Sequence, residues 1–139
     1  MAWRKGPFIL ISEYIQSNVS SSTYNDPSFK GYNVVASYVL SGEMRTYNKR
    51  SGLVNRVNVA KGVNSGGWGA LEVYCRWSSI DLSANSIDGG EMNTLSLGLN
   101  WIPIQAIQFN MNYRYSTLNR FGEVGFNHGI VTRIAFIME

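Results

Sequence analysis

Arginine and lysine side chains are the groups in this sequence best suited to bind a ligand. They gather in residues 42–66, where Glu43 is the only acid, and they recur within segments that alternate apolar and polar residues. A guanidinium group presents several donors in a planar fork, which suits anions that carry several oxygen atoms. The candidate anion-contacting residues are Arg45, Lys49, Arg50, Arg76, Arg114 and Arg133.

The same charges have a simpler interpretation, in which they are solvated and bind nothing. The arginines within alternating segments could instead pair with Glu13 and Glu72, and most exposed charges contribute little energy. The net charge of +3 and the pI near 9.1 are compatible with an anion-handling surface. They are too weak to indicate nucleic acid, and we expect no nucleic-acid partner.

Catalytic chemistry has little support. His128 is the single histidine, and no acid or nucleophile beside it would complete a triad. Cys75 lies between Val73 and Trp77 in an alternating segment, where packing explains it. No cluster of residues has metal-ligand spacing. We therefore expect no enzyme, no cofactor and no metal site.

The elements that must position the cations are β-strands. The chain has 139 residues, of which 45% are hydrophobic, but its mean hydropathy is only −0.11. No apolar run approaches the roughly 18 residues that a transmembrane helix needs. Alternation is clearest in 91–102, where Leu95, Leu97 and Leu99 oppose Ser96, Gly98 and Asn100. The fold class predicted is all-β, an antiparallel up-and-down meander of about six strands, at about 7–16, 31–41, 67–79, 91–102, 104–116 and 126–137.

The connections between these strands are polar and rich in turn residues. A tight turn is expected at Ile102-Pro103-Ile104, and longer connections at Ser17–Lys30, Gly42–Gly66, Ile80–Gly90 and Thr117–Gly125.

Aromatic residues end the apolar faces. Outer-membrane barrels carry aromatic girdles where strands meet the lipid headgroups, and a water-filled lumen tolerates charges at mid-strand. A soluble sandwich or barrel that binds a small ligand also shows alternation, so this alternative stays open. About six strands are too few to close a membrane barrel, so the membrane interpretation requires strands beyond this chain. The predicted girdle residues are Trp77, Trp101, Tyr113, Tyr115 and Phe136.

Four colinear motifs carry a family resemblance. Gly31–Arg45 resembles the stretch Tyr-x-x-x-Ser-Tyr-x-Leu-Thr-Gly-Glu-x-Arg of phosphate-selective porins O and P. Gly66–Leu82 is similar to their Gly-Gly-Trp-Gly-Ala-Trp-Glu-x-x-x-Arg-Tyr-Ser-x-x-Asp-Leu segment, with Leu71 in place of a Trp. Gly89–Ile102 and Gly6–Tyr14 match two shorter motifs.

The resemblance implies a homotrimeric channel of the bacterial outer membrane, with sixteen strands per subunit. Residues 1–139 would be a C-terminal segment of such a barrel, whose partners are the remaining strands, outer-membrane lipid and small anions. The start of the chain is not a convincing signal peptide, so we expect a fragment that conducts nothing alone. Phe136 has the register of the aromatic residue that usually ends such barrels, although Ile-Met-Glu follows it.

The expected function is passive diffusion of small anions such as phosphate. If the last strand runs toward the periplasm, the basic connection 42–66 is periplasmic, and the resemblance implies that it folds into the lumen. Arg45, Lys49 and Arg50 would then line the pore together with the strand arginines. A general or structural barrel without anion preference remains the alternative.

Overall fold

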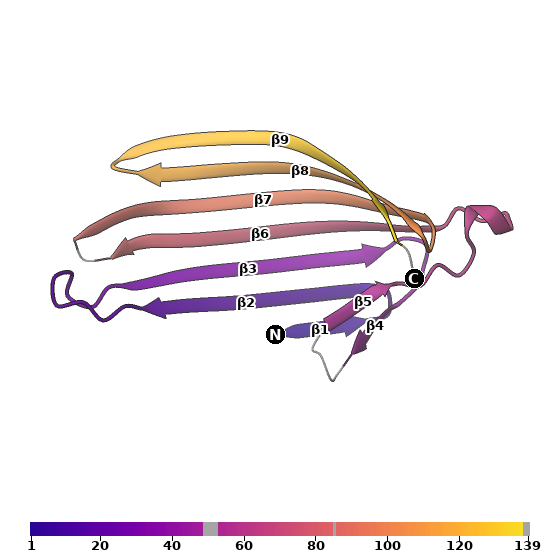
Figure 1. The fold of residues 1–139 in the computed structure, drawn as a ribbon, viewed down its shortest axis with the longest axis horizontal. Coiled ribbons are helices and arrows are strands. Elements are labelled where there is room, and N and C mark those ends of the chain that lie inside the picture. The colour runs from indigo at the N-terminus through magenta and orange to yellow at the C-terminus, as the bar shows by residue number, and fades with distance from the viewer. Residues whose placement is uncertain (49–52, 85, 138–139) are drawn as a thin grey trace.

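The structure is a computed structural model that describes residues 1–48, 53–84 and 86–137. Seven strands form one sheet in the order β1-β2-β3-β6-β7-β8-β9, and every neighbouring pair is antiparallel (Figure 1). These strands are β1 (Ala2–Lys5), β2 (Phe8–Asn18), β3 (Ser28–Val39), β6 (Ala70–Ala84), β7 (Ile87–Ile104), β8 (Ile107–Arg120) and β9 (Glu123–Phe136). Between β3 and β6 lie the hairpin of β4 (Arg45–Asn48) and β5 (Leu53–Val57) and the 3₁₀ turn η1 (Val63–Ser65).

The predicted all-β, antiparallel, up-and-down fold is confirmed, with seven strands in the sheet instead of about six. Strand β1 was not predicted because four residues are too few to display an alternating pattern. It pairs with β2 across the turn Gly6-Pro7, where Gly6 has a φ of 58°. That conformation costs glycine little and suits a two-residue hairpin.

Two hairpins reach further than the expected strands. Strands β6 and β7 continue into the expected connection Ile80–Gly90, and β8 and β9 continue into Thr117–Gly125. Residues there are largely polar, so hydropathy shows no contrast, but the backbone ladder continues regardless of side-chain type. Phe121 and Gly122 close the second hairpin with φ values of 55° and 79°, the signs of a type I′ turn.

The turn between β7 and β8 also differs from the expectation. It lies at residues 105–106, after Ile102-Pro103-Ile104, which belong to β7. The ladder between Trp101↔Phe109 and Ile104↔Ile107 shifts register, which leaves Pro103 inside an irregularity. Proline has no amide hydrogen to donate, so a bulge near a turn accommodates it within a strand.

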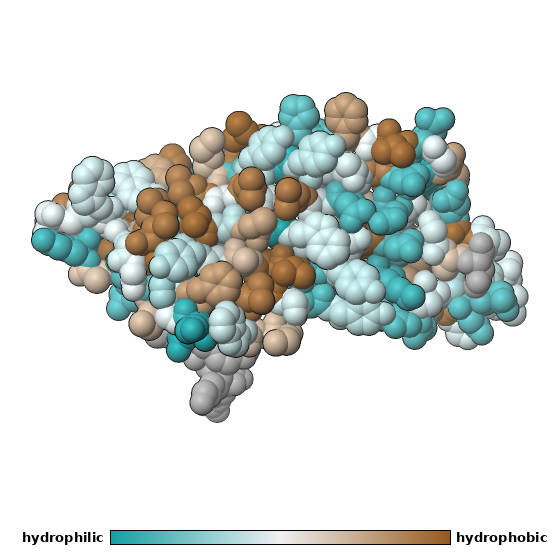
Figure 2. All heavy atoms as spheres, turned by 180° about the vertical axis from the view of Figure 1, so that it is seen from behind, coloured by the Kyte–Doolittle hydropathy of each residue, from teal (hydrophilic) through white to brown (hydrophobic). Residues whose placement is uncertain are grey.

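The two faces of the sheet differ in chemistry. One cross-strand row on the apolar face contains Trp3, Leu10, Ala36, Cys75, Leu97, Tyr113 and Ile130. Leu97 is 50% exposed, and most large apolar side chains of this face are exposed. Seen from behind in Figure 2, hydrophobic side chains gather from the middle of the sheet toward the end that carries the connection 42–66, and hydrophilic ones gather at the end with the β6–β7 and β8–β9 turns.

The buried apolar core is small and lies where the connection packs on the sheet. Val57 of β5 joins Val39, Ala70 and Ile102, with Val59 against them. The β4–β5 hairpin lies near one end of the sheet, the end that also carries the β7–β8 turn and the end of β9 (Figure 1). Apart from this contact the described residues form a single layer, and no second layer covers either face.

Candidate functional site on the polar face

The polar face of the sheet carries three of the six candidate cations. The alternation of the strands places Arg76 on β6 and Arg114 on β8 opposite Ser96 of β7, one on each side of it. Arg133 of β9 pairs in register with Asn110 of β8. Residues in one cross-strand row share a face, and so do residues an even number of positions apart on a strand, such as Asn110 and Arg114. The three arginines therefore project from the same surface.

The arginines of the polar face differ in how they are partnered. Arg76 donates from Nε to Oδ1 of Asn33 at 2.8 Å, and Asn33 in turn donates to Glu13 at 3.2 Å. Within the part of the chain that the structure describes, Arg114 and Arg133 make no hydrogen bond or ion pair. Their guanidinium groups are therefore available to solutes.

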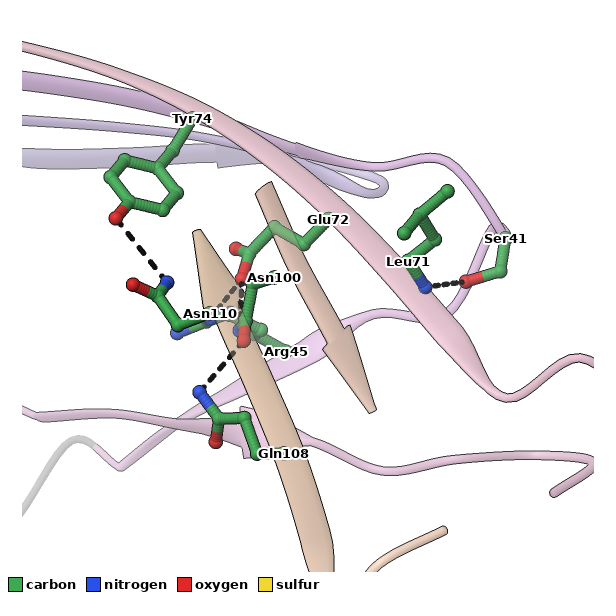
Figure 3. A network of polar contacts seen from close by, with 8 residues as sticks. All are labelled: Ser41, Arg45, Leu71, Glu72, Tyr74, Asn100, Gln108 and Asn110. Atoms are coloured by element: carbon green, nitrogen blue, oxygen red, sulfur yellow. Dashed lines mark hydrogen bonds and ion pairs between the residues drawn. The ribbon is translucent and has the colours of Figure 1, made fainter. Parts of the chain in front are cut away.

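Arg45 is instead held by a buried acid. Glu72 is only 2% exposed, and it forms an ion pair with Arg45. Asn100 donates to the same carboxylate oxygen at 3.2 Å, and Gln108 donates to Asn100 at 2.8 Å (Figure 3). A buried carboxylate is tolerated only when it is paired and hydrogen-bonded, so this network accounts for a buried acid on the polar face of the sheet.

The ion pair also anchors the connection 42–66 to the sheet. Arg45 begins β4, and its carbonyl oxygen accepts a hydrogen bond from Nη1 of Arg4 at 2.6 Å. The contact of Val57 with the sheet fixes the other strand of the hairpin. Lys49 and Arg50 lie outside the described residues, so the structure places only Arg45 among the three predicted cations of the connection.

Tyr74 and Gly98 form a contact that sequence reasoning missed. They are cross-strand partners on the polar face, and a methyl group on Gly98 would overlap the ring and hydroxyl of Tyr74. The Tyr74 hydroxyl accepts hydrogen bonds from Asn112 at 3.1 Å and Asn110 at 3.3 Å. A glycine in the middle of a long strand was the available signal, since it marks close approach of another group.

The predicted aromatic residues lie on the apolar face at three levels. Trp101 stacks on Phe109 with ring centroids 5.3 Å apart, and Phe136 lies further toward the connection end. Trp77 and Tyr115 flank Leu95 at the opposite level, and Tyr113 lies between the levels. The sequence-based set omitted Tyr14 and Tyr32, whose rings are 5.0 Å apart on β2 and β3.

Other chemistry finds little support in the described residues. His128 is exposed on the apolar face opposite Tyr115, and Cys75 is an exposed free cysteine. No group of three His, Cys, Asp or Glu side chains among the described residues could hold a metal ion. The described residues contain no helix that is long and apolar enough to span a membrane.

Comparison with known proteins agrees with the motifs. Porin O of Pseudomonas aeruginosa is 26% identical over 152 aligned residues, which cover 98% of this chain and 33% of that protein. An uncharacterised protein of Caulobacter vibrioides is 32% identical over 92 residues, 66% of this chain and 18% of that protein. The chain thus spans a third or less of each relative. The family model described as phosphate-selective porin O and P matches residues 1–123, so the chain belongs to the phosphate-selective porin O and P family.

Proposed function

We propose that this chain forms part of the wall of a bacterial outer-membrane porin through which small anions, such as phosphate, diffuse passively. The observation that carries the proposal is a single-layer sheet with two opposite faces, one exposing Leu97 and its neighbours and the other exposing free guanidinium groups. In a barrel wall the first face contacts lipid and the second contacts the water-filled lumen. The name of the Pseudomonas relative, Porin O, supports this assignment.

The apolar band has a height that suits a membrane. On β9 the apolar-face positions run from Phe126 to Phe136. About ten steps of 3.3 Å give roughly 33 Å along the strand, and a tilt of about 40° reduces this to about 25 Å, the height of the apolar band in such barrels.

The open edges of the sheet support a larger barrel. Among the described residues β1 pairs only with β2, and β9 only with β8. Unpaired edges at membrane depth would leave backbone groups without partners, so in the proposal both edges pair with further strands. The family resemblance supports a barrel of sixteen strands that assembles as a homotrimer.

The arginines contribute unequally to the proposed anion pathway. Glu72 balances the charge of Arg45, so Arg45 serves mainly to hold the connection against the lumen face. Arg114 and Arg133 keep uncompensated charges on that face, and Arg76 engages only a neutral amide through its Nε. Lys49 and Arg50 belong to the same connection as Arg45. Rings or rows of such cations raise the local anion concentration and favour anion passage.

Reversal potentials in planar bilayers test the proposal on the full-length porin that carries this segment. We expect Arg114→Gln with Arg133→Gln to lower the ratio of chloride to potassium permeability, and Arg114→Glu with Arg133→Glu to lower it further. Lys30→Gln is the matched control, because Lys30 lies on the other face at the polar end of β3. Lys49→Gln with Arg50→Gln tests the connection separately.

A barrel without anion preference is the competing function, and the pairing of Arg45 favours it. It predicts wild-type permeability ratios in all these variants while conductance persists. That outcome would refute the anion pathway and leave only the barrel wall. A soluble, monomeric protein in the absence of detergent would refute the barrel itself.

A further inference from the structure

A groove of about 530 Å³ lies at the connection end of the apolar face. Its lining consists of Gly69 and the side chains of Leu40, Ser41, Trp68, Leu71, Leu99 and Trp101. Leu71 and Trp101 are cross-strand partners on β6 and β7, so the floor of the groove is continuous with the exposed apolar face. The side chain of Leu71 points away from the Glu72 network of the polar face (Figure 3).

Trp68 forms one wall of this groove and is 89% exposed. Its backbone is nevertheless held in place, because its carbonyl oxygen accepts a hydrogen bond from the Trp101 indole at 2.8 Å. On one side of Trp68, Gly67 donates to Gly62 at 3.0 Å, and on the other side Gly69 donates to Lys61 at 3.1 Å. The Trp68 indole N–H has no acceptor among the residues that the structure describes.

Lys61 lies close to the two residues that flank Trp68, Gly67 and Gly69. The side-chain stem of Lys61 passes so close to Gly67 that a methyl group there would meet it. In the described part of the chain the Lys61 ammonium group has no ion pair. An apolar groove with an indole donor in its wall and a lysine next to the groove residue Gly69 is chemically complementary to an acyl chain that ends in a phosphate group.

We propose that the groove binds one phospholipid of the surrounding membrane. Its acyl chain lies over Leu71 and Leu99 between the two indoles, and its phosphate accepts from the Trp68 indole and pairs with Lys61. The inference rests on the proposed function, which places this face in the membrane, and it adds a defined lipid site. A neighbouring subunit is the other candidate occupant, but a lysine next to an apolar groove suits an anionic headgroup better.

Native mass spectrometry of the full-length porin, titrated with dioleoyl phosphatidylglycerol in detergent, tests the site. We expect Lys61→Gln to weaken the tightest bound lipid about fivefold, the effect of removing one cation near a headgroup. Trp68→Ala should weaken it at least as much. Trp77→Ala and Lys30→Gln are matched controls, since both residues lie outside the groove, and they should retain wild-type binding.

The outcomes separate the inference from the proposed function. Wild-type lipid retention in both Trp68→Ala and Lys61→Gln would overturn the lipid site, as would a loss of trimer mass in Trp68→Ala with lipid retention unchanged. The latter result would assign the groove to a subunit interface. Conductance of the wild-type protein in planar bilayers reports the proposed function separately: a protein that never conducts overturns both, whereas a conducting protein without groove-dependent lipid overturns only the site. Folding of each variant is checked by heat-modifiable migration on gels.

Discussion

Gly98→Ala is expected to destabilise the barrel by displacing Tyr74. The methyl group would occupy the space now filled by the Tyr74 ring, so the ring must tilt away from the sheet. Tilting breaks the two hydrogen bonds that Asn110 and Asn112 donate to the hydroxyl. Asn112 is only 8% exposed, so water replaces its lost partner poorly.

The expected loss of stability in Gly98→Ala is the sum of three contributions. Two neutral hydrogen bonds contribute about 1 kcal/mol each, and forcing a ring out of a filled site costs about 1 kcal/mol or more. Replacing glycine by alanine restricts the unfolded chain and returns about 0.4–1 kcal/mol. The net expectation is a loss of about 2 kcal/mol in the free energy of unfolding.

Urea unfolding of the full-length porin in vesicles, followed by tryptophan fluorescence, measures this loss. Gly129→Ala is the matched control, because Gly129 lies on the same face of β9 and a methyl group there meets nothing within 4 Å. In a Tyr74→Ala background, Gly98→Ala should cost little, since the obstructing ring is gone. Equal losses for Gly98→Ala and Gly129→Ala, or a full loss in the Tyr74→Ala background, would refute the reasoning.

Two further perturbations address the ion pair and the apolar face. Arg45→Met leaves the buried carboxylate of Glu72 without its ion pair, so we expect the free energy of unfolding to fall by about 3 kcal/mol and proteolysis of the connection 42–66 to become faster. The double variant Arg45→Met with Glu72→Leu should recover much of the lost stability. If it recovers none, the loss of the ion pair is not the cause. Leu97→Arg on the apolar face should lower the free energy of unfolding of the vesicle-inserted protein by about 2–4 kcal/mol, whereas Val131→Arg on the polar face should lower it much less. Equal losses for the two variants would argue against the proposed orientation of the sheet in the membrane.

The sequence by itself determined which side chains share a face. Successive side chains of a strand point to opposite sides as a property of the backbone, so the contrast between Leu97 and Ser96 is enough to assign each of them to its face. The same reasoning placed Arg114 on the polar face. The family motifs were also local, because each lies within one short stretch of the chain.

The tertiary structure decided what depends on register between strands. Tyr74 meets Gly98 because the register of β6 and β7 places them opposite each other. Arg45 meets Glu72 because the connection that carries Arg45 packs against the polar face of the sheet. Alternation fixes the face of a residue but not its neighbour on the next strand, since register depends on the hairpin turns. The turns were the least predictable elements, because polar residues extend the backbone ladder past the point where hydropathy loses its contrast. The charge of Arg45 was visible in the sequence, but only its contact with a buried acid showed that it anchors the connection.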